Sequence, residues 1–286
     1  MNYPKSVKVV EVGPRDGLQN EKKIISVEDK IEYINRLSDS GLKHIEVTSF
    51  VNPKSIPQLA DAEEVFSKIK KRNDVNYYAL VPNLKGLERA IKSGVKNISI
   101  FTASSDTFNQ KNINMTIDES ILNYSEVVKN AHESKMSVRA YISTAFYCPY
   151  EGKVDKNKTL EVCLKLMDLN IDELSVGDTI GKANSEDVRE VIQCLSDKIP
   201  KENIALHFHD TYGNAAKNVM AGLEFGISIY DSSCGGIGGC PYAPGASGNV
   251  STESLVRMLK DLNIETGVSL DKLAEASKFI GSKLKI

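Results

Sequence analysis

The feature of this sequence that most constrains its fold is an alternation of strand-like and helix-like segments that repeats eight times. Each repeat spans about 30 residues, the usual length of a strand, a crossover helix and their connections. The strand-like segments cover residues 7–12, 44–50, 76–82, 97–104, 137–147, 173–179, 203–210 and 227–234. The helical patterns that follow them cover residues 26–41, 61–71, 84–94, 119–135, 158–170, 185–199, 215–226 and 252–263. Strict alternation of this kind requires parallel strands.

Eight such units joined without a long linker favour a closed barrel over the competing architecture, an open doubly wound sheet. Barrels of about 250 residues commonly form one domain. The chain of 286 residues is therefore predicted to be a single α/β domain, residues 1–286, with a (β/α)₈ TIM barrel over about 7–265. A further helical pattern over 269–286 predicts a C-terminal helix.

Composition and charge exclude several classes of function. The formal net charge of −2 provides no basic field to attract nucleic acid. No apolar run reaches the roughly 20 residues that a membrane span needs, and the chain enters a strand pattern almost directly after its first residue. The five cysteines include no CxxC pair, so no disulfide framework is expected. These observations predict a cytoplasmic protein.

Residues suited to chemistry gather where the predicted strands end. The active sites of such barrels lie at the C-terminal ends of the strands and in the loops that follow them. At these ends, the sequence places Arg15, Asp16, Glu46, Asp178, His207, His209 and a glycine-rich segment, residues 235–249, which contains Cys240 and ends in Asn249. We expect these side chains to meet at one mouth of the barrel.

His207 and His209 are the sharpest local feature. Side chains two residues apart on a strand point to the same face, which is the interior in a barrel. With Asp16 and Asn249, the two histidines offer two nitrogen and two oxygen ligands. A closed structural zinc site usually contains cysteine, whereas this set suits octahedral Mg²⁺ or Mn²⁺. The alternative is a pair of structural, hydrogen-bonded histidines.

The other residues at the mouth admit two interpretations each. Arg15 could stabilise an enolate oxygen or bind a carboxylate, or it could form a salt bridge to Glu46 that closes the barrel mouth. Glu46 and Asp178 could support the ligands or transfer protons. The glycine-rich segment could close as a lid and bring Cys240 over the mouth as an acid or base. The alternative is an ordinary flexible connection with an exposed thiol, which the length of the segment disfavours.

Six motifs give the chain a family resemblance. The segments VEVGPRDGLQNE, IEVTSFVNPK, FYCPYEG, LSVGDTIG, HFHDTYGNA and GIGGCPYAPGASGNVSTE together resemble the 3-hydroxy-3-methylglutaryl-CoA lyases, over about residues 9–266. The segment around Cys240 is the most specific of them. The Arg-Asp pair and the His-x-His pair are shared with a wider group of metal-dependent barrel lyases and synthases.

The resemblance implies an activity and a role for each residue. Members of the family cleave their substrate into acetyl-CoA and acetoacetate, and they are homodimers that use a divalent cation. By resemblance, the cation ligands are Asp16, His207, His209 and Asn249. Arg15 is then expected to stabilise the enolate of acetyl-CoA, and Cys240 to act as the general acid or base. Glu46 and Asp178 are given supporting or proton-transfer roles.

Contacts with the acyl-CoA substrate are less well defined by the sequence. Gln19, Lys111 and Asn112 are predicted to contact it together with Arg15. Lys111 and Asn112 fall in the segment 108–114, which is interpreted as a loop after the fourth strand, and an ordinary surface loop is the alternative. No cysteine follows Cys240, so the thiol control that some relatives exert through a C-terminal cysteine is not expected.

Three alternative functions stay open. The first is a lyase for a related branched 3-hydroxyglutaryl-CoA with a longer group at C3. The second is a condensing acyltransferase on the same barrel, such as a 2-isopropylmalate or homocitrate synthase. Those enzymes typically lack the cysteine-bearing loop and often have additional C-terminal regions. The third, a non-catalytic metal-binding or scaffold barrel, is disfavoured because a residue is available for every catalytic role.

Overall fold

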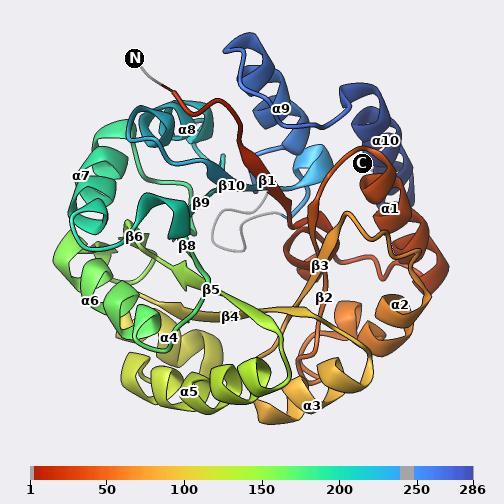
Figure 1. Cartoon of the computed structure of the whole chain (residues 1–286), viewed down its shortest axis with the longest axis horizontal. Helices are drawn as coiled ribbons and strands as arrows, with labels where there is room; N and C mark the ends of the chain where they lie inside the picture. The colour runs from red at the N-terminus through yellow and green to blue at the C-terminus, as the bar shows by residue number, and fades with distance from the viewer. Residues whose placement is uncertain (1–2, 239–247, 286) are drawn as a thin grey trace.

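The computed structural model describes residues 3–238 and 248–285, and eight parallel strands in it close into a barrel surrounded by helices (Figure 1). The order around the barrel is β1-β10-β9-β8-β5-β4-β3-β2, and pairing of β1 with β2 completes the circle. The barrel strands are β1 (Lys8–Glu11), β2 (His44–Ser49), β3 (Asn76–Leu80), β4 (Asn97–Ala103), β5 (Ser137–Ser143), β8 (Glu173–Asp178), β9 (Ile204–Phe208) and β10 (Ile229–Ser232). The predicted barrel is confirmed, and the open sheet is wrong.

Helices cover the outer surface of the barrel, as the sequence pattern predicts (Figure 1). They are α1 (Val27–Asp39), α2 (Ala62–Lys68), α3 (Leu84–Lys92), α4 (Asp106–Ile113), α5 (Ile117–Glu133), α6 (Lys156–Met167), α7 (Ser185–Ser196), α8 (Ala215–Glu224), α9 (Thr252–Asp261) and α10 (Leu270–Leu284). The C-terminal helix α10 packs against α1 and α9. Within the described part of the chain, no helix is both long enough and apolar enough to cross a lipid bilayer.

The predicted fifth strand is too long. β5 ends at Ser143, because Thr144 adopts the left-handed conformation (φ 55°) and turns the chain out of the sheet. The residues beyond it form β6 (Tyr147–Cys148), which pairs antiparallel with β7 (Gly152–Lys153) in a short hairpin. This hairpin lies outside the barrel sheet.

The segment 108–114, predicted as a loop, belongs largely to helix α4. Ser105 caps this helix, and its Oγ accepts a hydrogen bond from the backbone N–H of Phe108 at 3.0 Å. The helix ends at Asn114, which adopts the left-handed conformation. Its sequence is polar and has little of the 3.6-residue apolar period by which the other helices are recognised.

Alternate residues of the strands face opposite sides of the barrel wall. On β8, Leu174 and Val176 face outward and join the main hydrophobic core between the strands and the helices. Ser175 and Gly177 of the same strand line a cavity inside the barrel. The interior of such barrels is usually filled by branched apolar side chains. The polar residues inside this barrel therefore indicate where its functional site lies.

Glu11 connects three segments at the C-terminal end of β1. Its buried carboxylate accepts hydrogen bonds from the backbone N–H groups of Gly13 (2.8 Å) and Cys234 (2.9 Å) and from the hydroxyl of Thr252 (2.7 Å). A Cβ at Gly13 would lie 2.6 Å from Glu11 Oε1, so glycine is required there. Burial raises the pKa of Glu11 to about 7. This carboxylate therefore fixes the turn after β1 to the segments after β10.

The raised pKa of Glu11 predicts a pH dependence of stability. Between pH 4.5, the ordinary pKa value, and about pH 7, the folded protein holds a proton that the unfolded chain has released. The contribution of this group to stability therefore falls through that window, by roughly 3 kcal/mol, and is constant above it. The free energy of unfolding of Glu11→Gln, measured by urea denaturation, should therefore rise relative to the wild type by roughly 3 kcal/mol from pH 4.5 to about pH 7.

Glu32→Gln is the matched control, because Glu32 lies on the surface of α1 and pairs with Arg36 one helical turn away. Its stability should follow the wild-type curve between pH 4.5 and 7. Parallel curves for Glu11→Gln and the wild type would show that Glu11 does not take up a proton on folding.

Candidate active site

A cavity of about 770 Å³ lies at the C-terminal ends of the barrel strands. Its wall is formed by residues from β3, β4, β5 and β8 and from the loops that follow β1, β2 and β9. Seven residues predicted from the sequence line it, namely Arg15, Asp16, Gln19, Lys111, Asn112, His207 and His209. The structure therefore brings these seven residues together at the end of the barrel where the sequence analysis expects the site.

Arg15 and Asp16 lie in a tight helical turn, Gly13–Gly17, directly after β1. The backbone carbonyl of Val12 accepts hydrogen bonds from the N–H groups of Arg15 (3.2 Å), Asp16 (2.8 Å) and Gly17 (3.1 Å), which fixes the turn. A Cβ at Gly17 would lie 2.7 Å from Ile237 Cγ1, so the turn packs closely against the segment after β10. Both side chains are thereby held at the cavity wall.

Asp16, His207 and His209 form a cluster in which one potential ligand atom of each lies within 4.8 Å of the others. The two imidazole rings come from the end of β9, with ring centroids 5.3 Å apart. Asn249 joins them, because its Nδ2 donates a hydrogen bond to Asp16 Oδ2 at 2.9 Å and its backbone bridges to His209. The structure thus brings together all four residues that the sequence predicts as ligands.

The protonation states of this cluster fit a divalent cation. Burial lowers the pKa of His209 to about 4, so its ring is neutral, and its buried Nδ1 has no hydrogen-bond partner among the described residues. Burial alone would raise the pKa of Asp16, but the Arg15 guanidinium beside it holds that pKa well below its usual range. A carboxylate oxygen together with imidazole nitrogens is a donor set for Mg²⁺ or Mn²⁺.

Arg15 is held by two carboxylates. Its Nε lies 2.5 Å from Glu46 Oε2 and its Nη1 lies 2.7 Å from Asp16 Oδ1, and its guanidinium carbon is 5.0 Å from the ring centroid of Tyr141. Tyr141 also donates its hydroxyl to the same oxygen of Glu46, at 3.0 Å. The salt bridge that the sequence analysis gave as one interpretation therefore exists. Glu46 orients Arg15, which itself faces the cavity.

The structure does not bring Asp178 into this cluster. Its oxygens accept hydrogen bonds from the backbone N–H groups of Lys182 (3.1 Å) and Ala183 (2.9 Å), and burial raises its pKa to about 7. The cavity is lined by Gly177 and Thr179 on either side of it. Alternation along β8 places this carboxyl group off the cavity wall, where it anchors the following loop. The supporting or proton-transfer role given to Asp178 stays a prediction.

The residues predicted to contact the acyl-CoA lie at the edge of the cavity. Lys111 and Asn112 come from α4, and Gln19 follows the turn that carries Arg15. Lys111 Nζ lies 4.2 Å from the ring centroid of Tyr150, an exposed residue in the β6–β7 hairpin. Helix α4, which borders the cavity, therefore packs against this hairpin.

Cys240 lies outside the described residues. Gly238, the last described residue before it, lines the cavity and has no room for a side chain. A Cβ at Gly238 would lie 2.7 Å from Asn249 Nδ2 and 2.9 Å from the Cα of Gly17. The first part of the glycine-rich segment thus reaches the cavity two residues before Cys240.

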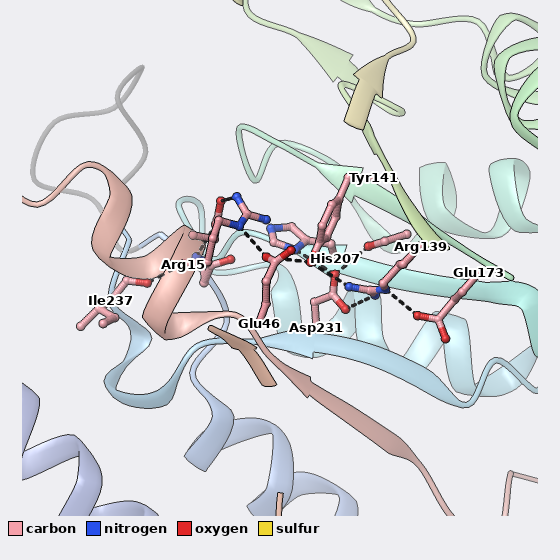
Figure 2. A network of polar contacts seen from close by, with 11 residues as sticks. Arg15, Glu46, Arg139, Tyr141, Glu173, His207, Asp231 and Ile237 are labelled. Atoms are coloured by element: carbon pink, nitrogen blue, oxygen red, sulfur yellow. Dashed lines mark hydrogen bonds and ion pairs between the residues drawn. The ribbon is translucent and has the colours of Figure 1, made fainter. Parts of the chain in front are cut away.

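Sequence reasoning missed a row of buried polar residues below the cluster. Figure 2 shows hydrogen bonds and ion pairs that run from Arg15 and Glu46 to Tyr141. From there they continue through Arg139 to Asp231 and His207. The signal that could have found them is their position on the strands. Tyr141 and Asp231 occupy interior-facing positions where an apolar residue is usual.

The fold and the cluster at its mouth define a class, the (β/α)₈-barrel enzymes with a candidate divalent-metal centre. A family description, HMGL-like, matches residues 6–280. The chain is 48% identical over 284 residues to hydroxymethylglutaryl-CoA lyase YngG of Bacillus subtilis, covering 99% of this chain and 95% of that protein. The chain therefore belongs to the HMGL-like family, among the hydroxymethylglutaryl-CoA lyases.

Two further relatives agree with this placement. A Pseudomonas aeruginosa protein named 3-hydroxy-3-isohexenylglutaryl-CoA/hydroxy-methylglutaryl-CoA lyase is 48% identical over 280 residues, covering 98% of this chain and 93% of that protein. A solved HMG-CoA lyase structure from Acinetobacter baumannii, in complex with coenzyme A and 3-methylmalate, is 38% identical with a TM-score of 0.94. That match covers 100% of this chain and 93% of the other. The comparisons favour the lyases over the condensing synthases.

Because Arg15 and Glu46 form a buried ion pair, removing one of the two charges should strongly lower the free energy of unfolding. Glu46→Gln keeps the shape of the side chain and leaves the guanidinium buried beside Asp16 alone. Breaking a buried ion pair in this way typically costs about 3–5 kcal/mol. We expect a loss of this size in the free energy of unfolding, measured by urea denaturation.

The control is Glu63→Gln, which breaks the surface pair of Glu63 with Arg89. About half of the Glu63 side chain is exposed, so the expected loss is about 1 kcal/mol or less. If Glu46→Gln were no more damaging than Glu63→Gln, the pair with Arg15 would not hold the mouth of the barrel.

Proposed function

We propose that this protein cleaves 3-hydroxy-3-methylglutaryl-CoA into acetyl-CoA and acetoacetate, with Mg²⁺ or Mn²⁺ as its cofactor. The observation that carries the proposal is the cluster of Asp16, His207 and His209 beside Arg15 in one cavity. The names of the relatives, most of them hydroxymethylglutaryl-CoA lyases, support the choice of substrate.

The reaction breaks the bond between C2 and C3 of the substrate. The tertiary hydroxyl on C3 loses its proton, and its oxygen becomes the ketone oxygen of acetoacetate. The electron pair of the broken bond passes to C2, which is then part of a thioester enolate. Protonation of C2 completes acetyl-CoA. The site must therefore favour loss of the hydroxyl proton, stabilise negative charge on the thioester oxygen, and deliver a proton to carbon.

The residues at the cavity wall match these requirements. A divalent cation, when held by Asp16, His207, His209 and Asn249, supplies Lewis acidity that lowers the pKa of the hydroxyl. Arg15 presents a fixed positive charge to the enolate oxygen, and such preorganised charge is commonly the largest contribution to catalysis. The ion pair with Glu46 holds Arg15 in place, so little reorganisation is required when the negative charge develops.

The CoA portion of the substrate is proposed to lie along Gln19, Lys111 and Asn112. Lys111 offers a positive charge for phosphate, and the two amide side chains can pair with the pantetheine amides. The solved relative that contains coenzyme A supports a CoA ligand for this fold. The homodimer implied by the family resemblance stays a prediction, because the structure describes a single chain.

The experiment that tests the proposal is an assay of acetoacetate release from 3-hydroxy-3-methylglutaryl-CoA by metal-free protein, with and without added Mn²⁺ or Mg²⁺. Metal-dependent release is expected. The 3-isohexenyl analogue is assayed in parallel, because the Pseudomonas relative is named for both substrates. Release from the analogue alone would reassign the substrate. Release from neither substrate by protein with Mn²⁺ bound would contradict the proposed function.

We propose Cys240 as the group that protonates C2, because the resemblance assigns the general acid to this cysteine. Cys240→Ser should then lower kcat by a factor of about 10² or more with little change in KM. The matched control is Cys194→Ser, because Cys194 is a partly exposed thiol on α7, outside the cavity lining. Its kcat should equal the wild-type value. An unchanged kcat in Cys240→Ser would remove the thiol from the reaction.

A further inference from the structure

Three charged side chains are buried inside the barrel below the metal-ligand cluster. Arg139 of β5 lies between Glu173 of β8 and Asp231 of β10, and its side chain is only 2% exposed. The Nε of Arg139 is 2.5 Å from Glu173 Oε1, and its Nη2 donates to Asp231 Oδ1. Lys8 makes a second ion pair with Glu173, at 2.6 Å. Charges of opposite sign therefore alternate from the N-terminal end of the barrel toward the cavity.

Asp231 is the member of this row that reaches the cluster. Its Oδ2 lies 3.1 Å from Nδ1 of His207 and accepts a hydrogen bond of 2.6 Å from the hydroxyl of Ser175. Its Oδ1 faces Arg139. The Asp231 side chain is fully buried, and each of its oxygens has a partner. The carboxylate thus has a single orientation, fixed from three strands.

This contact decides which nitrogen of His207 is available to a ligand. A carboxylate accepts hydrogen bonds, so Nδ1 of His207 must carry the proton that it donates to Asp231. In a neutral ring, Nε2 then carries the lone pair. Nδ1 is occupied by Asp231, and Nε2 is the atom left for the cluster with Asp16 and His209.

The second histidine of the pair has no such support. Nδ1 of His209 is buried and has no hydrogen-bond partner in the part of the chain that the structure describes. Carboxylate partners of metal-ligating histidines fix both the tautomer and the ring orientation. The two histidines are therefore not equivalent, and His207 is the one whose orientation is fixed before a ligand arrives.

We propose that Asp231 is a positioning residue that holds His207 as the Nδ1–H tautomer with Nε2 toward the cation site, and that Arg139 restrains Asp231 for this purpose. The part that concerns the cation rests on the proposed function. Asp231 is not part of the cavity wall, and we expect it to act on the reaction through His207.

The first test measures Mn²⁺ affinity by calorimetry in the wild type and in Asp231→Asn. Loss of a supporting partner of this kind typically weakens metal binding about 10- to 100-fold, and we expect a loss in that range. Glu173→Gln is the matched control, because it removes the other carboxylate that pairs with Arg139 but leaves the contact of Asp231 with His207. It should destabilise the fold while leaving Mn²⁺ affinity within about threefold of the wild type.

Equal losses of Mn²⁺ affinity in the two variants would show that the row of charges supports only the fold, and would overturn the proposal. So would wild-type affinity in Asp231→Asn.

The second test needs no variant, and it stands if Asp231→Asn fails to fold. Long-range ¹H–¹⁵N correlation spectra of the metal-free wild type report the tautomer of each of its four histidines. His207 should be in the Nδ1–H form. The Nε2–H form would overturn the proposal. The tautomer of His207 can be measured whether or not the proposed function is correct. If the wild type does not bind Mn²⁺, the cation site is contradicted, but the measured tautomer of His207 still tests the role of Asp231.

Discussion

The burial of charged side chains inside a closed barrel is the constraint on which the rest of this structure depends. Taking an ion out of water costs several kcal/mol, and pairing offsets that penalty only when the geometry is good. Arg15 meets this condition with Glu46 and Asp16, and Arg139 meets it with Asp231 and Glu173. A barrel interior filled by apolar side chains would avoid the penalty. The benefit of these buried ion pairs is that they hold the side chains of the cavity in fixed orientations.

The outward and inward faces of the barrel wall have different roles, one in folding and the other in the chemistry of the site. Outward residues such as Val176 pack against the helices and stabilise the barrel, while inward residues such as Ser175 and Tyr141 form the network below the cavity. Glu11 joins the two, because it faces outward yet fixes the turn that carries the first metal-ligand candidate, Asp16. The geometry of the site therefore rests on contacts made on both sides of the wall.

The barrel and the position of its site could be predicted from the sequence, because apolar periodicity identifies strands and helices and the fold places function at the strand ends. Helix α4 could not, since its polar residues carry little apolar period. The orientation of Asp178 could not be predicted, because a shift of one residue along a strand decides whether a side chain faces the cavity or the helices. Asp231 was missed because the sequence of β10 does not reveal the partners of this carboxylate, His207 on the neighbouring strand β9 and Arg139 on β5 across the barrel.

The central claim is that the polar interior of the barrel holds one divalent cation between Asp16, His207 and His209, where it meets Arg15 and the substrate. The most direct measurement is anomalous X-ray scattering from crystals of the protein grown with Mn²⁺. The account predicts one anomalous peak within bonding distance of the Asp16 carboxylate, of His209 and of Nε2 of His207. A manganese peak elsewhere on the chain, or no peak at the cluster in crystals of protein saturated with Mn²⁺, would contradict it.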